Sequence, residues 1–371
     1  MPPPDATSNR LNIRARRALV GGRLVDDVVI IVRDGLIAAI EPDGDRYRGD
    51  PVHDLVSPGL VDLQCNGFED VSVLGSSAVE LAALRRALAR VGTTAFLPTI
   101  TSSALSEMTA AIEAIVDANT DQPDHGAVML GVHFEGPFLG RRPGAHDSRV
   151  IEQSVRHVEV ISEMYDRHAR LVTLAAESPV VGPVTTRLRL RNIPFLVGHS
   201  EPTRTEYEEL VATGLRGCTH VFNAMSGVEH RGFGLAGAIL DDPTMYAGLI
   251  GDLVHVEAET IRLVHRVKGP NRTFLVSDSV GHRGLVVSDA GRLPDGRLAG
   301  SVVPLAGAVR HLVTHAGIPL ADALISATAA PCGVIGDATR GRLEAGLRAD
   351  LTCFDAGLAV ERVYVAGVPQ A

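Results

Sequence analysis

PFLVGHS at residues 194–200 and GCTHVFN at residues 217–223 are two short apolar runs, and each is interrupted by a histidine. A short run of this kind, bounded by glycine or polar residues, is typical of a parallel strand that is buried on both faces. His199 and His220 therefore lie where a buried strand gives way to a loop. Strands of this type belong to folds in which helices alternate with the strands of a parallel sheet.

The same pattern of strand, loop and helix repeats from residue 55 to about residue 328. The expected strands are 55–64, 92–99, 128–135, 171–177, 195–199, 217–220, 246–252 and 274–278. The expected helices are 77–90, 103–118, 154–168, 203–212 and 257–267. Eight strands that alternate with helices predict an α/β fold, a (β/α)8 TIM-like barrel.

The two ends of the chain have a different pattern. Residues 11–54 contain short strand-like runs separated by Gly21-Gly22 and Asp34-Gly35, and Asp-Gly is a strong hairpin signal. Residues 341–371 contain similar runs. We therefore expect a small β-sandwich domain formed by both termini, from 11–54 and 341–371, beside a barrel domain over 55–340.

Composition excludes several classes of function. The net charge of −9 and the lack of a basic block argue against a nucleic-acid partner. No run of 18 apolar residues is present, so no membrane-spanning helix is expected. The proline-rich residues 1–10 predict a frayed tail rather than a signal peptide. The cysteines form no Cys-x-x-Cys pair, which favours reduced thiols and a cytoplasmic location; they are Cys65, Cys218, Cys332 and Cys353.

Three strand ends offer metal ligands. Glu135 ends the run 128–135, His199 ends the run 195–199 and His220 ends the run 217–220. A catalytic zinc site typically has three nitrogen or oxygen ligands from the protein and an open position for water. We predict one divalent metal per subunit, zinc by default, with Fe2+, Co2+ or Mn2+ suited to the same ligands. A barrel without catalytic function that only binds a sugar is the alternative from another class.

Asp278 ends the eighth expected strand and is the candidate general base, because a carboxylate that faces an activated water can take its proton. Its alternative role is a helix N-cap. A two-metal barrel hydrolase would have His-x-His at the first strand end. Gln64 and Asn66 stand there instead. Neutral amides are poor ligands for zinc, so this pair favours one metal, with Gln64 orienting water; a turn at Asn66-Gly67 is the simpler interpretation.

Five residues of the expected loops complete the candidate site. His146 can donate to a carbonyl oxygen as negative charge develops. His255 and Arg231 are candidates for phosphate or sugar contacts. The amide of Asn223 and the backbone NH groups of Asn223 and Ala224 can bind a substrate anion or hydroxyl. Taken separately, each is as easily explained as a solvated loop residue.

Seven stretches together resemble the N-acetylglucosamine-6-phosphate deacetylase family of the amidohydrolase superfamily. They are SPGLVDLQCNG at 57–67, GTTAFLPT at 92–99, VHFEGPF at 132–138, GHS at 198–200, THVFNAM at 219–225, GLAGAIL at 234–240 and LAGS at 298–301. The similarity extends from about residue 18 to the C-terminus. The resemblance implies a deacetylase that hydrolyses the acetamide of N-acetylglucosamine 6-phosphate, a linear amide, to glucosamine 6-phosphate and acetate.

The resemblance also assigns roles by motif position. Glu135, His199 and His220 resemble the family's metal ligands, Asp278 its acid and base, and His146 the residue that polarises the acetamide carbonyl. The positions that resemble the family's sugar-phosphate contacts are Asn223, Ala224, Arg231 and His255. Gln64 and Asn66 resemble the single-metal branch of the family. The family further implies a homodimer in which the partner subunit supplies a phosphate ligand.

Two segments depart from the family pattern. Residues 279–284 are SVGHRG and residues 302–305 are VVPL, and both are expected to border the substrate. The sequence therefore leaves three alternative substrates open for the same chemistry. They are N-acetylgalactosamine 6-phosphate, an unphosphorylated N-acetyl amino sugar and an N-acyl amino acid.

Overall fold

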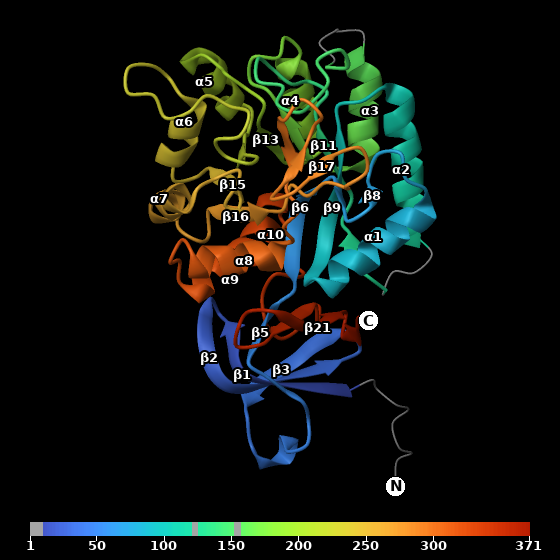
Figure 1. Cartoon of the computed structure of the whole chain (residues 1–371), viewed down its shortest axis with the longest axis vertical. Coiled ribbons are helices and arrows are strands. Elements are labelled where there is room, and N and C mark those ends of the chain that lie inside the picture. Colours follow the sequence, from blue (N-terminus) through green and yellow to red (C-terminus); the bar gives the residue numbers. More distant parts are fainter. Residues whose placement is uncertain (1–9, 121–124, 152–156) are drawn as a thin grey trace.

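A computed structural model describes residues 10–120, 125–151 and 157–371. The predicted tail at residues 1–10 lies outside this range except for Arg10, which begins the first strand. The first residues of the helix predicted from residue 154 also lie outside it. In the described chain, a barrel surrounded by helices stands above a separate β-sheet (Figure 1).

Eight parallel strands form the barrel, as predicted. In order around the barrel they are β6 (Leu60–Cys65), β9 (Thr93–Thr101), β11 (Val132–Glu135), β12 (Ala169–Leu174), β13 (Phe195–Val197), β14 (Gly217–Cys218), β15 (Tyr246–Ile250) and β16 (Thr273–Val276), with β10 (Val128–Met129) paired to β9 ahead of β11. The ring is brought together where Asp278 N donates to Gln64 O at 2.9 Å. Ser277 N donates to the buried Asp62 carboxylate at 3.1 Å across the same seam.

Helices cover the outside of the barrel (Figure 1). They are α1 (Ala78–Arg90), α2 (Leu105–Thr120), α3 (Val158–His168), α4 (Val181–Leu190), α5 (Arg204–Ala212), α6 (Leu235–Asp241), α7 (Ala258–Lys268), α8 (Leu305–Thr314), α9 (Leu320–Ala327) and α10 (Ala329–Ile335). Ser77 and Thr203 begin α1 and α5 with complete capping boxes, which explains why the sequence predicted both starts well. Five of these helices are absent from the prediction: α4, α6, α8, α9 and α10. Helix α4 has Gly182-Pro183 in its first turn and α6 has only seven residues, which weakens the helical signal of both.

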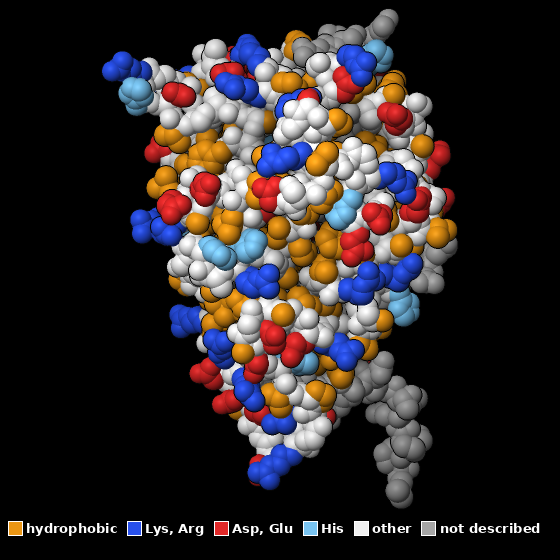
Figure 2. Space-filling model, in the orientation of Figure 1, with side chains coloured by type: hydrophobic (Ala, Val, Ile, Leu, Met, Phe, Trp, Pro, Cys, Tyr) orange, Lys and Arg blue, Asp and Glu red, His pale blue; other side chains and the backbone are white. Residues whose placement is uncertain are grey.

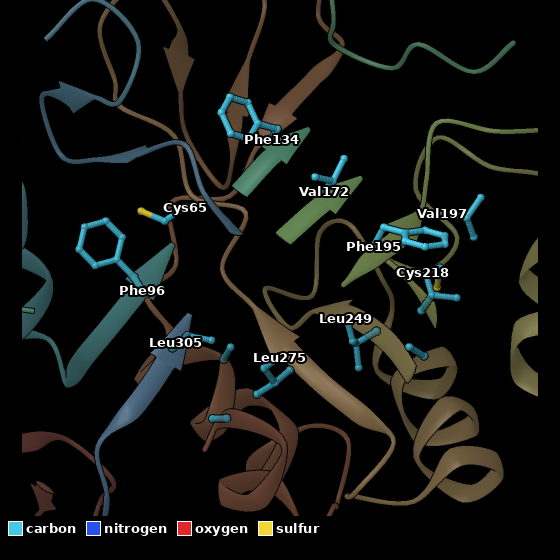
Figure 3. Close-up of a cluster of buried hydrophobic side chains, with 14 of the residues drawn as sticks. Cys65, Phe96, Phe134, Val172, Phe195, Val197, Cys218, Leu249, Leu275 and Leu305 are labelled. Carbon is cyan, nitrogen blue, oxygen red and sulfur yellow. The ribbon is translucent and has the colours of Figure 1, made fainter. Parts of the chain in front are cut away.

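Alternation along the barrel strands separates two apolar layers. In β9, Ala95 and Leu97 belong to the cluster inside the barrel, while Phe96 packs outward against the helices. In β11, Phe134 points outward to the helix-facing cluster drawn in Figure 3. Glu135, the next residue, therefore points into the barrel. The packing of Phe134 against the helices fixes the direction of Glu135, because turning the strand over would move the Phe134 ring out of the apolar core.

Both termini contribute to one eight-stranded sheet, which confirms the predicted accessory β domain. Its strands are β1 (Arg10–Val20), β2 (Arg23–Arg33), β3 (Leu36–Pro42), β4 (Val52–His53), β5 (Leu55–Pro58), β20 (Leu351–Phe354), β21 (Val360–Val365) and β22 (Val368–Pro369), with a short 3-10 helix η1 (Asp45–Tyr47) after β3. Gly21-Gly22 and Asp34-Gly35 form the two predicted hairpin turns, and all four have positive φ. Seven of the strands follow one hydrogen-bonded path in the order β22-β21-β20-β5-β1-β2-β3, and β4 pairs with β1 beside it.

The strand predicted at 55–64 is divided between the two parts of the fold at Gly59. Strand β5 pairs with β1 and β20 of the terminal sheet, whereas β6 pairs with β9 of the barrel. A Cβ on Gly59 would lie 2.1 Å from Thr94 Oγ1, so only glycine fits this crossing. Both halves are buried, and Pro58-Gly59 is a turn signal at the change of sheet that the prediction of one strand over 55–64 did not use. The domain limits themselves stay a prediction.

Two small β elements border the barrel mouth. Strands β7 (Gly67–Phe68) and β8 (Val71–Ser72) form a hairpin after β6, and β17 (Val286–Val287), β18 (Gly291–Arg292) and β19 (Leu298–Gly300) form an insert between β16 and α8. Among the described helices, none is both long and apolar enough to cross a bilayer. All four cysteines are buried and free, and burial raises the pKa of the Cys65 and Cys218 thiols to about 12.

Candidate active site

A cavity of about 510 Å3 opens where the barrel strands end. Its lining includes nine of the residues singled out in the sequence: Asn66, Glu135, His146, His199, His220, Asn223, Ala224, His255 and Asp278. They come from the ends of six of the eight barrel strands and from the loops that follow; these strands are β6, β11, β13, β14, β15 and β16. The structure thus brings together side chains that lie up to about two hundred residues apart in the chain. The carboxyl-terminal face of the barrel is where enzymes of this architecture place their active sites.

Glu135, His199 and His220 converge on one point. Glu135 Oε1 lies 3.0 Å from Nε2 of His199 and 3.0 Å from Nε2 of His220. The two imidazole nitrogens are 3.2 Å apart, and none of the three side chains is more than 5 % exposed. One carboxylate oxygen and two imidazole nitrogens that face each other this closely form a ligand set of the kind that a catalytic zinc uses.

The hydrogen bonds of His199 make it fit for a metal. Its Nδ1 lies 3.2 Å from the carbonyl oxygen of Pro143, which can only accept, so the ring proton is on Nδ1 and the lone pair of Nε2 points to Glu135. Burial lowers the pKa of His199 to about 4, which keeps the ring neutral. Burial raises the pKa of Glu135, but its contacts with His146, His199 and His220 outweigh burial and hold that pKa well below its usual range. An ionised carboxylate beside a neutral imidazole is what a metal requires.

His146 approaches the same carboxylate from the other side. Its Nε2 lies 3.6 Å from Glu135 Oε2, and Glu135, His146 and His199 have ligand atoms within 4.8 Å of one another, so they too could hold an ion. The hydrogen bonds distinguish the two histidines. The N–H of Ser102 donates to Nδ1 of His146 at 3.3 Å, so the proton of a neutral His146 ring is on Nε2. His146 therefore offers a donor to the cavity, whereas His199 offers a lone pair.

Gln64 and Asn66 tie the two acidic residues together. Gln64 Nε2 donates to Glu135 Oε1 at 2.7 Å and to Asp278 Oδ1 at 3.2 Å, and Asn66 Nδ2 donates to Asp278 Oδ1 at 2.8 Å. The hydroxyl of Thr219 donates to Gln64 Oε1 and so fixes which end of the amide faces the carboxylates. Burial raises the pKa of Asp278 to about 6. Thr219 had no sequence signal as a site residue, because its partner lies 155 positions away.

Strained backbone marks the same strand ends. His199, Ala224 and Asp278 have φ of 51°, 49° and 47°, in the left-handed region that non-glycine residues rarely adopt. Phe222 and Leu253, next to other cavity residues, are also left-handed, with φ of 75° and 67°. Such conformations cost free energy and gather at functional sites, where the surrounding structure holds them in place.

His255, Asn223 and Ala224 line the side of the cavity. The Nδ1 atom of His255 lies 2.7 Å from Oδ2 of Asp252, which orients the ring. Burial raises the pKa of Asp252, but the contact with His255 outweighs it, so the pKa of this carboxyl is lowered. Asp252 is a partner that sequence reasoning missed, although it lies three positions before His255 in the same predicted strand end.

Two predicted site residues do not line the cavity. Gln64 is buried and reaches the site through its hydrogen bonds to Glu135 and Asp278, whereas Arg231 lies away from the cavity. Its side chain is exposed and is absent from the described residues that line the cavity. The loop that carries Arg231 packs against α5 through Phe233. The Phe233 ring lies 5.4 Å from the ring of Tyr207, and the guanidinium of Arg204 stacks on it. The predicted sugar-phosphate contact of Arg231 stays a prediction.

No protein-family model matches the chain. Among curated relatives, the N-acetylglucosamine-6-phosphate deacetylase of Bos taurus is 31% identical over 94% of this chain and 89% of its own. The N-acetylgalactosamine-6-phosphate deacetylase of Escherichia coli O157:H7 is 29% identical over 96% and 98%. The crystal structure of the N-acetylglucosamine-6-phosphate deacetylase from Pasteurella multocida matches with a TM-score of 0.88 and 27% identity, covering 97% of this chain and 100% of that chain.

The barrel and its buried Glu–His–His cluster define an amidohydrolase, an enzyme that hydrolyses a linear amide. The similarity to the relatives extends over nearly the whole chain and identifies one family within this class. The chain belongs to the N-acetylglucosamine-6-phosphate deacetylase family. The resemblance noted from the sequence motifs is thereby confirmed.

Proposed function

We propose that this protein hydrolyses the acetamide of N-acetylglucosamine 6-phosphate to glucosamine 6-phosphate and acetate. The observation that carries the proposal is the convergence of Glu135, His199 and His220, with Asp278 beside them, at the base of one cavity. We further propose that these three ligands hold one divalent metal per subunit, with zinc as the default. When bound, such a metal polarises the acetyl carbonyl and lowers the pKa of the attacking water.

Asp278 moves the proton in this proposal. Within the described residues, only its Oδ1 accepts hydrogen bonds, from Asn66 and Gln64, so Oδ2 keeps its lone pairs. Asp278 takes the proton of water as the water attacks the acetyl carbon. It then gives that proton to the amide nitrogen as the carbon–nitrogen bond breaks. The pKa of about 6 keeps the carboxylate ionised at neutral pH and still basic enough to accept a proton.

His146 supports the oxygen of the acetyl group. Ser102 holds the ring in the tautomer with a proton on Nε2, and this N–H faces the cavity. It donates a hydrogen bond to the acetyl oxygen as negative charge develops there. Because the donor is in place before the reaction, its orientation costs nothing in the transition state.

The sugar is bound by Asn223, Ala224 and His255 in this proposal, with Asp252 holding the His255 ring at 2.7 Å. We also propose a cytoplasmic homodimer. Arg231 lies on an exposed loop. In this proposal, Arg231 of one subunit contacts the phosphate of the substrate bound in the neighbouring subunit.

A substrate panel tests the function. Purified, metal-loaded protein is given N-acetylglucosamine 6-phosphate, N-acetylgalactosamine 6-phosphate, N-acetylglucosamine and an N-acyl amino acid, and acetate release is measured. We expect the highest kcat/KM for N-acetylglucosamine 6-phosphate. Absence of acetate above background from both sugar phosphates would refute the proposal. Metal analysis separates a sugar-binding barrel from an enzyme, because about one metal per chain is expected and consistently none would favour mere binding.

A further inference from the structure

The loop that carries His146 folds as a tight turn against a proposed metal ligand. The N–H of His146 donates to the carbonyl oxygen of Pro143 at 3.1 Å, and Nδ1 of His199 donates to the same oxygen at 3.2 Å. One carbonyl group therefore fixes the backbone at His146 and the tautomer of His199 together. The direction of this carbonyl decides how both histidines face the cavity.

Gly144, the next residue, packs directly on the His199 ring. A Cβ at this position would lie 3.2 Å from Ala224 Cβ and 3.3 Å from Cε1 of His199, and the φ of Gly144 is 61°. Both the space and the backbone conformation suit glycine. The loop thus cannot move farther inward, and it can leave the His199 ring only toward the solvent.

An arginine from a distant segment holds this loop from the solvent side. Arg297 Nη1 donates to the carbonyl oxygen of Gly144 at 2.7 Å, although the two residues are 153 positions apart. Asp295 fixes the arginine in turn, because its carboxylate accepts from Nε of Arg297 at 2.8 Å and from the backbone N–H of Arg297 at 3.0 Å. The guanidinium therefore meets the loop in a preset direction.

Arg297 belongs to the insert of β17, β18 and β19, which also forms part of the cavity wall. The insert is drawn in orange around the label β17 in Figure 1. Arg297 lies in the turn between β18 and β19, where the N–H of Leu293 donates to Arg297 O at 2.9 Å. Three apolar residues at this turn line the cavity: Leu293, Leu298 and Ala299. The contact with Gly144 thus connects one wall of the cavity to the loop of His146.

We propose that Arg297 is a positioning residue of the active site, which acts through the loop that carries His146. By holding Gly144, it keeps the Pro143 carbonyl against His199, so that Nε2 of His199 offers its lone pair to the metal. It also keeps the Nε2 proton of His146 directed at the acetyl oxygen. The inference rests on the proposed function, from which it takes the roles of both histidines. Arg297 itself contacts neither the metal nor the substrate.

Zinc affinity tests this role without turnover. Competition with a chromogenic chelator measures the Kd of zinc for wild type, Arg297→Gln and Arg297→Lys. Loss of a group that orients a metal ligand typically weakens metal binding about 10–100-fold, but Arg297 acts one contact farther out and its side chain is 55% exposed. We therefore expect Arg297→Gln to raise the Kd of zinc about three- to tenfold. Arg297→Lys keeps a donor and is expected to recover most of the affinity.

The control variant is Arg292→Gln. Arg292 lies in the same insert, but its described contacts stay within the insert, with Asp289 at 3.5 Å and Gly296 O at 3.4 Å. Basic and acidic side chains are interspersed on the face shown in Figure 2, so the loss of one charge is expected to matter less than the loss of one contact. Arg292→Gln is therefore expected to match wild type in zinc affinity and in kinetics.

Steady-state kinetics of the zinc-saturated variants separate positioning from substrate binding. Arg297→Gln is expected to lower kcat for N-acetylglucosamine 6-phosphate about three- to tenfold. Its KM is expected to stay close to that of wild type, because Arg297 does not touch the sugar in this inference. A higher KM with unchanged kcat would make Arg297 a substrate-binding residue and would contradict the inference.

Hydrogen exchange reports on the loop itself. The N–H of His146 is protected by its bond to Pro143 O, and we expect it to exchange about tenfold faster in metal-free Arg297→Gln than in metal-free wild type. The urea midpoint of the variant is expected to stay close to that of wild type, because an exposed ion pair contributes little to stability. A large fall in the midpoint with unchanged zinc affinity and exchange would give Arg297 a purely structural role and overturn the inference.

The outcomes distinguish this inference from the proposed function. Equal zinc affinity and equal exchange in wild type and Arg297→Gln would overturn the inference, as would losses of the same size in Arg292→Gln. Absence of acetate release by wild type would instead refute the proposed function. Zinc affinity and hydrogen exchange would still decide whether Arg297 holds the loop.

Discussion

Replacing Asp278 by asparagine separates proton transfer from geometry. The two side chains have the same shape, and an asparagine Oδ1 can still accept from Asn66 and Gln64, which donate at 2.8 and 3.2 Å in the wild-type protein. The lone pairs that take the proton are lost with Oδ2. General acid–base groups contribute about 10²–10⁴ to rate, so Asp278→Asn is expected to lose about that factor in kcat while metal content stays normal.

Asp278→Asn is expected to raise the free energy of unfolding although it lowers kcat. Burial raises the pKa of Asp278 to about 6, whereas an unperturbed aspartate has a pKa of about 3.9. The difference means that ionising Asp278 destabilises the metal-free folded chain by about 3 kcal/mol. Because the folded pKa is the higher one, this cost is absent below about pH 4, grows between about pH 4 and 6, and is complete above about pH 6. The inactive variant is therefore expected to be more stable than wild type at neutral pH.

Urea unfolding of both proteins in chelator, from pH 5 to pH 8.5, measures this difference. The difference in unfolding free energy, variant minus wild type, is expected to increase with pH and to level off above about pH 6.5. Desolvation of the asparagine amide lowers this difference by the same amount at every pH. A difference that does not change with pH would refute the argument from burial. A kcat within tenfold of wild type at normal metal content would refute the assignment of Asp278 as the base.

Three further predictions concern the surroundings of this residue. Thr219→Val leaves Gln64 Oε1 without its donor and is expected to cost about 1–3 kcal/mol of unfolding free energy and part of kcat, both restored by Thr219→Ser; equal effects of Val and Ser would contradict the role of the hydroxyl. Asp252→Asn weakens the contact that orients His255, so steady-state kinetics are expected to show a higher KM with kcat nearly unchanged, and an unchanged KM would count against it. Chelation is expected to abolish acetate release, and zinc at about 100 times its Kd is expected to add about 2.7 kcal/mol to the unfolding free energy, which His199→Ala would prevent.

The barrel could be predicted from the sequence because its strands are buried on both faces. Continuous apolar runs then mark each strand, and polar residues within two positions of the end of a run mark its carboxyl end. His199, His220 and Asp278 follow their strands in this way, and the structure places all three at the cavity. The prediction missed the division at Gly59 because two buried strands of different sheets follow each other directly, although Pro58-Gly59 is a pair that marks turns.

The partners of the site residues were beyond single-sequence reasoning for a different reason. Hydrogen bonds such as Thr219 to Gln64 and Ser102 to His146 join segments 155 and 44 positions apart. Nothing in the local pattern distinguishes these hydroxyl and backbone donors from the many others in the chain. Arg231 lies on a loop away from the cavity of its own chain, and its predicted contact with phosphate stays a prediction.

The amides at the first strand end give a physical reason for proposing one metal per subunit. In the structure, Gln64 donates to Glu135 and to Asp278, and Asn66 donates to Asp278. Each amide N–H therefore occupies space near a carboxylate oxygen where a second cation would have to lie, and it balances part of the negative charge that such a cation would need. A histidine at either position would offer a lone pair in place of two donors. Gln64 and Asn66 thus favour a mononuclear site through the donors they present as well as through the ligands they lack.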